Sequence, residues 1–287
     1  MNMPASKSAS TVPNHYVETG GRTIAYRSIG SGTAMILCNR FRGTMDSWDP
    51  AFIDALVSHG IRVITFDYSG LGASTGTPDY NPEHLARDAI DLADALELDA
   101  PVISGWSLGG IAAQIALAMA PKRFSRAVLI GTTPPGDLVK GAEQLFYDTA
   151  SRVEYGLEDE IVLFFEPRSA ESVAAARRSH TRLAARTQDR SPPIPIDFAV
   201  AYLGSEPKNP VFPAPAVLEL LRTTSVPILH IGADHDIIFP VENWYALNQK
   251  LPTLQLITYP SSGHGPQSQH PESCAANIAA FIGRPVT

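Results

Sequence analysis

The chain has 287 residues, of which 44% are hydrophobic and 18% charged, so it can bury a large core and is not intrinsically disordered. A net charge of −7 without a long basic run argues against nucleic acid and anionic membranes as partners. The start of the sequence has no apolar leader, and two cysteines, Cys38 and Cys274, are too few for a disulfide framework, so we expect a cytoplasmic protein.

The N-terminal part predicts a tail followed by a hairpin. Residues 1–14 are rich in Ser, Pro and Thr without periodicity, and we expect them to be flexible. Residues 15–18 and 22–29 then alternate in polarity around Gly20-Gly21. Paired glycines supply the positive φ angles of tight hairpin turns, which predicts two antiparallel strands.

From residue 34 the pattern changes to short apolar runs separated by amphipathic segments. Such alternation is typical of buried parallel strands joined by crossover helices. The expected strands are 34–38, 61–66, 102–104, 127–130, 226–231 and 254–259, and the expected helices are 50–59, 82–96, 108–120, 241–251 and 272–282. The sequence therefore predicts an α/β protein with a mostly parallel central sheet flanked by helices.

One long segment, residues 132–224, interrupts this alternation. It contains no convincing strand but has helical and aromatic stretches, including Phe146-Tyr147 and Phe164-Phe165. We interpret it as a mostly helical insertion. The core domain then consists of residues 15–131 and 225–287.

The strongest motif is GWSLGG at residues 105–110, between a predicted strand and a predicted helix. A sharp strand-to-helix turn would hold Ser107 in a strained conformation at a helix N-terminus, where the helix dipole favours developing negative charge. Small residues at 105 and 109 would let neighbouring backbone pass close by. Ser107 is therefore the predicted nucleophile.

A neutral serine needs a base, and His264 is the best placed of the eight histidines, in the loop SSGHG after the last predicted strand. The acid that orients this histidine is expected in GADHD at residues 232–236, where we choose Asp236 and keep Asp234 as the alternative. Metal binding at Asp234, His235 and Asp236 is disfavoured, because adjacent residues of an extended chain point in opposite directions. We expect neither a metal nor a cofactor.

Together, GWSLGG, GADHDIIFP, SSGHG and the strand–helix alternation resemble the α/β-hydrolase superfamily over about residues 15–284. The resemblance implies that residues 132–224 form a helical cap domain over the active site. It also implies an oxyanion hole made by the backbone N–H groups of Leu108 and Phe41. The chain departs from the family pattern at Asn39 and Arg40, which stand where His-Gly is usual.

Two interpretations of Arg40 and Arg42 stay open. Either arginine binds a carboxylate or carbonyl of the substrate, or both form salt bridges with the nearby Asp46 or Asp49, which is the alternative that we favour. Trp106, beside the nucleophile, is expected to touch an apolar substrate.

These patterns predict a serine hydrolase that cleaves a carboxylic ester or lactone of a small, apolar, carbonyl-containing molecule. The same residues would also serve a hydrolase of carbon–carbon bonds in diketones, or an enzyme resembling haloperoxidases and perhydrolases. A ligand receptor on a hydrolase scaffold is the alternative from another class. The physiological substrate and the oligomeric state stay open.

Overall fold

The computed structural model describes residues 8–284, which form one eight-stranded sheet in the order β1-β2-β4-β3-β5-β6-β7-β8. β1 and β2 form the predicted antiparallel hairpin, β2 is antiparallel to β4, and every other neighbouring pair is parallel. The strands are β1 (His15–Thr19), β2 (Arg22–Ile29), β3 (Thr33–Cys38), β4 (Ile61–Phe66), β5 (Val102–Trp106), β6 (Arg126–Ile130), β7 (Ile228–Ala233) and β8 (Leu254–Tyr259). The predicted mostly parallel sheet is confirmed.

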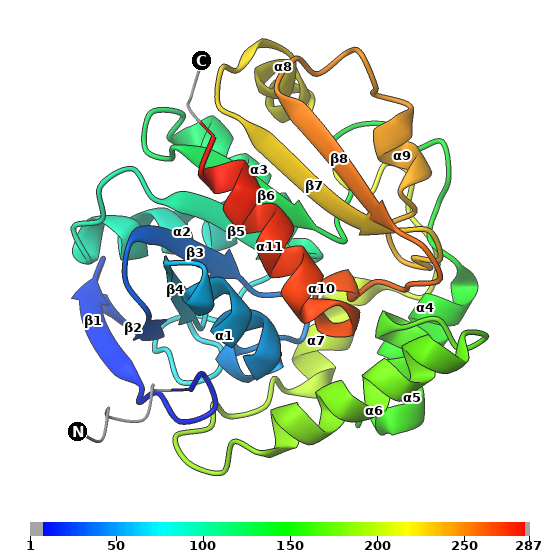
Figure 1. The fold of residues 1–287 in the computed structure, drawn as a ribbon, viewed down its shortest axis with the longest axis horizontal. Helices are drawn as coiled ribbons and strands as arrows, with labels where there is room; N and C mark the ends of the chain where they lie inside the picture. The colour runs from blue at the N-terminus through cyan, green and yellow to red at the C-terminus, as the bar shows by residue number, and fades with distance from the viewer. Residues whose placement is uncertain (1–7, 285–287) are drawn as a thin grey trace.

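Helices cover both faces of this sheet (Figure 1). α1 (Pro50–Ser58) and α11 (Pro271–Ile282) pack together on one face, and α2 (Pro82–Ala95) and α3 (Leu108–Met119) pack together on the other. Each face has its own buried apolar cluster, because the central strands are apolar on both sides. Within residues 8–284, none of the helices is both long enough and apolar enough to cross a membrane.

Two short helices and one truncated helix differ from the sequence-based expectation. η1 (Met45–Ser47) and α10 (Pro266–Gln269) were not expected, and the helix predicted at 241–251 is only α9 (Glu242–Tyr245). The chain after α9 continues in i→i+3 turns, and Gln249 has a φ of 64°. A regular α-helix cannot continue through that left-handed conformation.

The predicted helical insertion contains α4 (Gln144–Ala150), α5 (Leu157–Phe164), α6 (Ala170–Ala184), α7 (Ile196–Leu203) and α8 (Pro215–Thr223). Its β-structure is limited to an isolated bridge between Gly136 and Phe212. α4 to α7 lie on the side toward which the arrowheads of β7 and β8 point, whereas α8 lies apart from them (Figure 1). α8 packs on α3, with Leu221 fully buried, so it extends the helical layer of the core.

The expected flexible tail is wrong for residues 8–14, while residues 1–7 lie outside the described part of the chain. Ala9 and Val12 are buried, and Asp54 accepts hydrogen bonds from Ser8 Oγ at 2.8 Å and from Ala9 N at 2.7 Å. Arg186 donates to the carbonyl oxygen of Val12 at 2.9 Å. These partners lie in distant segments of the chain, so the local sequence pattern of residues 8–14 could not reveal the contacts.

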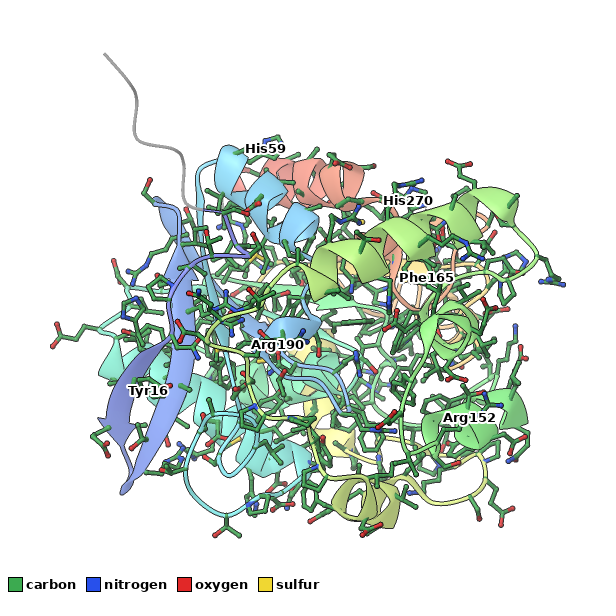
Figure 2. All side chains as sticks on the ribbon, turned by 90° about the horizontal axis from the view of Figure 1, so that it is seen from below. Tyr16, His59, Arg152, Phe165, Arg190 and His270 are labelled. Carbon is green, nitrogen blue, oxygen red and sulfur yellow. The ribbon has the colours of Figure 1, made fainter. Side chains whose placement is uncertain are left out.

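Residues 185–195, which join α6 to α7, tie the insertion to the core, and we call them the strap. Ser191 donates from its N–H to Asp46 at 2.8 Å and from its hydroxyl to Asp67 at 2.6 Å. Asp46 also pairs with Arg27 at 2.7 Å and lies 3.5 Å from Arg186. Figure 2 shows Arg190 of the strap between Tyr16 of β1 and Phe165 of the insertion.

One buried histidine makes the fold sensitive to acid. His230 on β7 is 1% exposed and stacks on Trp244 with ring centroids 4.7 Å apart. Burial lowers the pKa of His230 to about 3, so the folded protein keeps this ring neutral. The unfolded chain takes up that proton near pH 6.5. Below this pH the unfolded state binds more protons, so stability falls as the pH falls from about 6.5 toward 3.

We predict that His230 costs the wild type about 2 kcal/mol of unfolding free energy on going from pH 7 to pH 5. His230→Phe, which keeps a ring against Trp244, should lose less stability by about that amount over the same interval. Urea unfolding of both proteins at the two pH values measures the difference. Equal losses in the two proteins would contradict the prediction.

Candidate active site

Ser107 occupies a strained turn between β5 and α3. Its φ of 61° and ψ of −122° lie outside the regions that L-residues ordinarily adopt. The turn is held by hydrogen bonds from Ser107 N to the carbonyl oxygen of Ile130 at 2.9 Å and from Thr132 Oγ1 to the carbonyl oxygen of Ser107 at 2.7 Å. The predicted serine at a strand-to-helix turn is therefore present, with the geometry that the motif requires.

Two glycines of the motif allow the backbone to come this close. A Cβ atom on Gly105 would lie 2.0 Å from the carbonyl oxygen of Gly109. A Cβ atom on Gly109 would lie 2.0 Å from the carbonyl oxygen of Cys38, at the end of β3. The start of α3 thus rests directly against the neighbouring strand end.

His264 and Asp236 form a buried pair. His264 Nδ1 lies 2.8 Å from Asp236 Oδ2, and both side chains are 1% exposed. The other carboxylate oxygen, Oδ1, accepts the N–H groups of Ile238 and Phe239, each at 2.8 Å. Because Asp236 accepts a hydrogen bond from Nδ1–H, the lone pair of the neutral ring lies on Nε2. Nε2 is buried and has no hydrogen-bond partner among the described residues.

Asp234, the alternative acid, has other partners. It lies 2.7 Å from His235 Nδ1 and accepts the N–H of Ser262 at 3.3 Å. These bonds hold the loop before His264. Across residues 8–284, no group of three or more His, Cys, Asp and Glu side chains is arranged to hold a metal ion.

Ser107 lines two cavities, which we call the inner and the outer cavity. The inner cavity has a volume of about 20 Å³ and is also lined by Arg40, Phe41, Phe164 and His264. The outer cavity has a volume of about 390 Å³. Its apolar walls come from α3 and from the insertion and include Leu108, Ile111, Phe146, Tyr147 and Phe212. Ser107 and His264 therefore meet at one cavity, beside a larger apolar one.

The loop after β3 is anchored by Asn39, whose role the sequence left open. The Asn39 side chain donates to the carbonyl oxygen of Phe66 at 2.6 Å and accepts the indole N–H of Trp48 at 2.8 Å. These bonds fix the loop that carries Phe41. Among the described residues, neither the N–H of Phe41 nor that of Leu108 has a hydrogen-bond acceptor. Phe41 lines both cavities, and Leu108 lines the outer one.

Trp106 lies behind the site. It is 3% exposed, and its indole N–H donates to the carbonyl oxygen of His264 at 2.8 Å. Its ring packs against Phe164, with centroids 5.3 Å apart. Trp106 lines neither cavity, although the sequence predicted that it would touch the substrate. Its hydrogen bond to the carbonyl oxygen of His264 positions the His264 loop instead.

The favoured salt bridges of Arg40 and Arg42 with Asp46 or Asp49 are wrong. Asp49 forms a salt bridge with Arg182, whose Nη2 lies 2.6 Å from the carboxylate. Asp46 forms salt bridges with Arg27 of β2 and Arg186 of the strap. Arg42 instead donates to the carbonyl oxygens of Ala150 and Val153 in the insertion, at 3.1 and 2.8 Å. These partners are more than 100 residues away in the sequence, so spacing could not reveal them.

Known proteins resemble the chain over nearly its whole length. A family model described as the alpha/beta hydrolase fold matches residues 33–271. A pimeloyl-[acyl-carrier protein] methyl ester esterase of Aromatoleum aromaticum is 31% identical over 235 residues, covering 78% of this chain and 88% of the relative. An alpha/beta hydrolase fold protein from Chitinophaga pinensis matches with a TM-score of 0.82 and 28% identity, covering 97% of this chain and all of that one. A meta-cleavage product hydrolase from Pseudomonas fluorescens IP01 shares the fold, with a TM-score of 0.69 and 22% identity over 93% of this chain and 97% of that one.

We predict that Gly109→Ala destabilises the protein by about 1–3 kcal/mol, because the new methyl group must push α3 away from the carbonyl oxygen of Cys38. Gly141→Ala is the control, since nothing lies within 4 Å of a Cβ atom at that position. Chemical denaturation measures both variants. Similar stability of the two variants would contradict the close contact.

Proposed function

This chain belongs to the α/β-hydrolase fold family, and we propose that it is a serine hydrolase that cleaves a carboxylic ester or lactone through an acyl-enzyme. One observation carries the proposal. The His264–Asp236 pair leaves Nε2 of His264 without a partner at the same inner cavity that Ser107 lines. The esterase relative from Aromatoleum aromaticum supports the choice of an ester as substrate.

In the first step, Ser107 Oγ attacks the carbonyl carbon while His264 Nε2 takes the hydroxyl proton. Asp236 stabilises the imidazolium that forms, because its Oδ2 accepts the Nδ1–H at 2.8 Å. The two N–H groups that donate to Oδ1 keep this carboxylate in place. The negative charge thus stays on a fixed carboxylate beside the developing positive charge.

The oxygen of the tetrahedral intermediate needs hydrogen-bond donors that are already in position. We assign this role to the backbone N–H groups of Leu108 and Phe41. Both groups lack an acceptor among the described residues, and Leu108 is the first residue of α3, where the helix dipole also favours negative charge.

Breakdown of the intermediate transfers the proton from His264 to the leaving alcohol and leaves Ser107 acylated. A water molecule then attacks the carbonyl carbon of the acyl group while His264 accepts its proton. His264 returns this proton to Ser107 Oγ as the carbon–Oγ bond breaks and the acid departs. A lactone follows the same route, with the alcohol and the acid in one product. All of these steps use the chain's own residues, and none requires a cofactor.

The outer cavity supports a substrate with a sizeable apolar group. Its volume of about 390 Å³ falls within the usual range for small-molecule sites, and most of its walls are aliphatic or aromatic. Several of these residues come from the segment that follows β6, including Phe146, Tyr147 and Phe212. We therefore propose that residues 132–214 act as the cap, and that α8 belongs to the core.

The other reactions open to such a site differ in the substrate and not in the residues. Hydrolysis of carbon–carbon bonds and peracid formation would use the same serine and histidine, whereas a receptor would bind ligand without acylation. Covalent labelling of Ser107 by a fluorophosphonate separates the receptor from the enzymes, because the reagent reports an activated serine. We expect stoichiometric labelling.

We predict that Ser107→Ala lowers the rate of hydrolysis of p-nitrophenyl butyrate by about 10³-fold or more, and that His264→Ala does nearly the same. Removing either residue blocks proton transfer from the nucleophile. Release of p-nitrophenolate, measured under single-turnover conditions, gives the rate of acylation in each variant.

Ser104→Ala is the matched control, because Ser104 lies on β5, the strand that ends just before Ser107, and is fully buried, with a hydroxyl that has no hydrogen-bond partner among the described residues. It should keep the wild-type rate. Equal rates for wild type and Ser107→Ala would reject the serine mechanism, and failure of fluorophosphonate labelling would favour a receptor.

A further inference from the structure

Arg40 has a guanidinium group at the inner cavity without a carboxylate partner among the described residues. Its Nη1 donates to the carbonyl oxygen of Phe41 at 2.8 Å, and its Nε is buried without an acceptor. A guanidinium has five N–H donors, so most of its hydrogen-bonding capacity is unused. Burying a cation without a counterion costs folding free energy, so a ligand that supplies the missing negative charge would explain why Arg40 is kept there.

Two other arginines pair with the carboxylates that lie closest to Arg40 in the sequence. Arg27 pairs with Asp46 at 2.7 Å, and Arg182 pairs with Asp49 through two nitrogen–oxygen contacts of 2.7 and 2.6 Å. Arg40 lies in the same part of the chain as these carboxylates and pairs with neither. The acceptor that matches its charge is therefore not supplied by residues 8–284.

Aromatic rings hold the Arg40 side chain in place. Its guanidinium carbon lies 4.6 Å from the centroid of Phe164 and 5.3 Å from that of Trp106. Contact with aromatic faces stabilises a cation while leaving its N–H edge available for hydrogen bonds. Burial lowers the pKa of Arg40, and this effect exceeds the opposite effect of Glu160, which acts on the guanidinium without forming an ion pair with it. The group is thus fixed in position without an ion-pair partner among the described residues.

We propose that Arg40 binds a carboxylate on the substrate, so that the preferred substrates are esters with a free acid group within a few bonds of the scissile carbonyl. A carboxylate matches the planar, forked guanidinium. The free acid group must lie close to the scissile carbonyl, because Arg40, Ser107 and His264 all line a cavity of only about 20 Å³. The apolar remainder of the substrate then occupies the outer cavity. This inference rests on the proposed ester hydrolysis.

Two pairs of esters test whether Arg40 binds a substrate carboxylate. The two members of each pair have nearly equal shape, and one has a carboxylate where the other has a methyl group. Monomethyl glutarate against methyl pentanoate places the charge on the acyl side, and carboxymethyl pentanoate against ethyl pentanoate places it on the alcohol side. Proton release in a pH-stat gives kcat/KM for each ester. We expect the wild type to favour the charged member of at least one pair.

Arg40→Met, which keeps the length of the side chain and its contact with the rings, should lower that preference by about 10- to 100-fold. Arg40→Lys should retain part of it, because the charge remains but the fork is lost. Arg42→Met removes a nearby charge that faces the insertion and should leave the preference unchanged. An equal loss of rate on charged and neutral esters in Arg40→Met would overturn the proposal and assign Arg40 to the oxyanion or to the loop.

Binding to the Ser107→Ala protein separates this proposal from the proposed function. By calorimetry, monomethyl glutarate should bind more tightly than methyl pentanoate, and the difference should disappear when Arg40→Met is added. That result would support the Arg40 site even if no ester were hydrolysed. Hydrolysis through Ser107 with equal binding of these two esters would reject the Arg40 site and leave the hydrolase intact.

Discussion

The contact between the first turn of α3 and the end of β3 is the constraint on which the site depends. Gly109 lies so close to the carbonyl oxygen of Cys38 that no side chain fits between them. This contact places the end of β3, from which the loop that carries Phe41 continues, against the first turn of α3, which begins at Leu108 directly after Ser107. The contact involves backbone atoms alone. It therefore fixes the position of the Ser107 turn against the end of β3 independently of the side chains around the cavities.

Much of the fold could be predicted, because local rules and burial agree there. β2, β4 and β8 have the predicted limits, since the alternating polarity of β2 and the apolar run of β4 are bounded by turn residues, which defines strands well. α1 and α2 begin where Asp49 and Asn81 cap a first-turn proline. The pairing of Asp236 with His264 was also foreseen, because both follow neighbouring strands whose carboxyl ends lie at one edge of the sheet.

What escaped prediction depends on contacts between distant segments. Asn39 bonds to the carbonyl oxygen of Phe66, Trp106 bonds to that of His264, and Arg42 bonds to carbonyl oxygens of the insertion. Backbone carbonyls carry no sequence signature, so a search for charged partners favoured Asp46 and Asp49 instead. The ordered residues 8–14 have the same origin, because they are held by Asp54 and Arg186.

The strap limits which parts of the insertion can change during evolution without disturbing the segments near the nucleophile. Hydrogen bonds and ion pairs join Ser191 and Arg186 to Asp46, in the short helix η1 after β3, and to Asp67, in the loop after β4. The strap is therefore bound into the same network as the loops beside the nucleophile, and mutations in it would disturb both. α4 is joined to the loop after β3 through the carbonyl oxygen of Ala150, which Arg42 binds, whereas the side chains of α4 and of residues 211–214 that line the outer cavity form no hydrogen bond to these segments. Natural drift or laboratory evolution can thus reshape the pocket through those positions while inheriting the reactive groups unchanged.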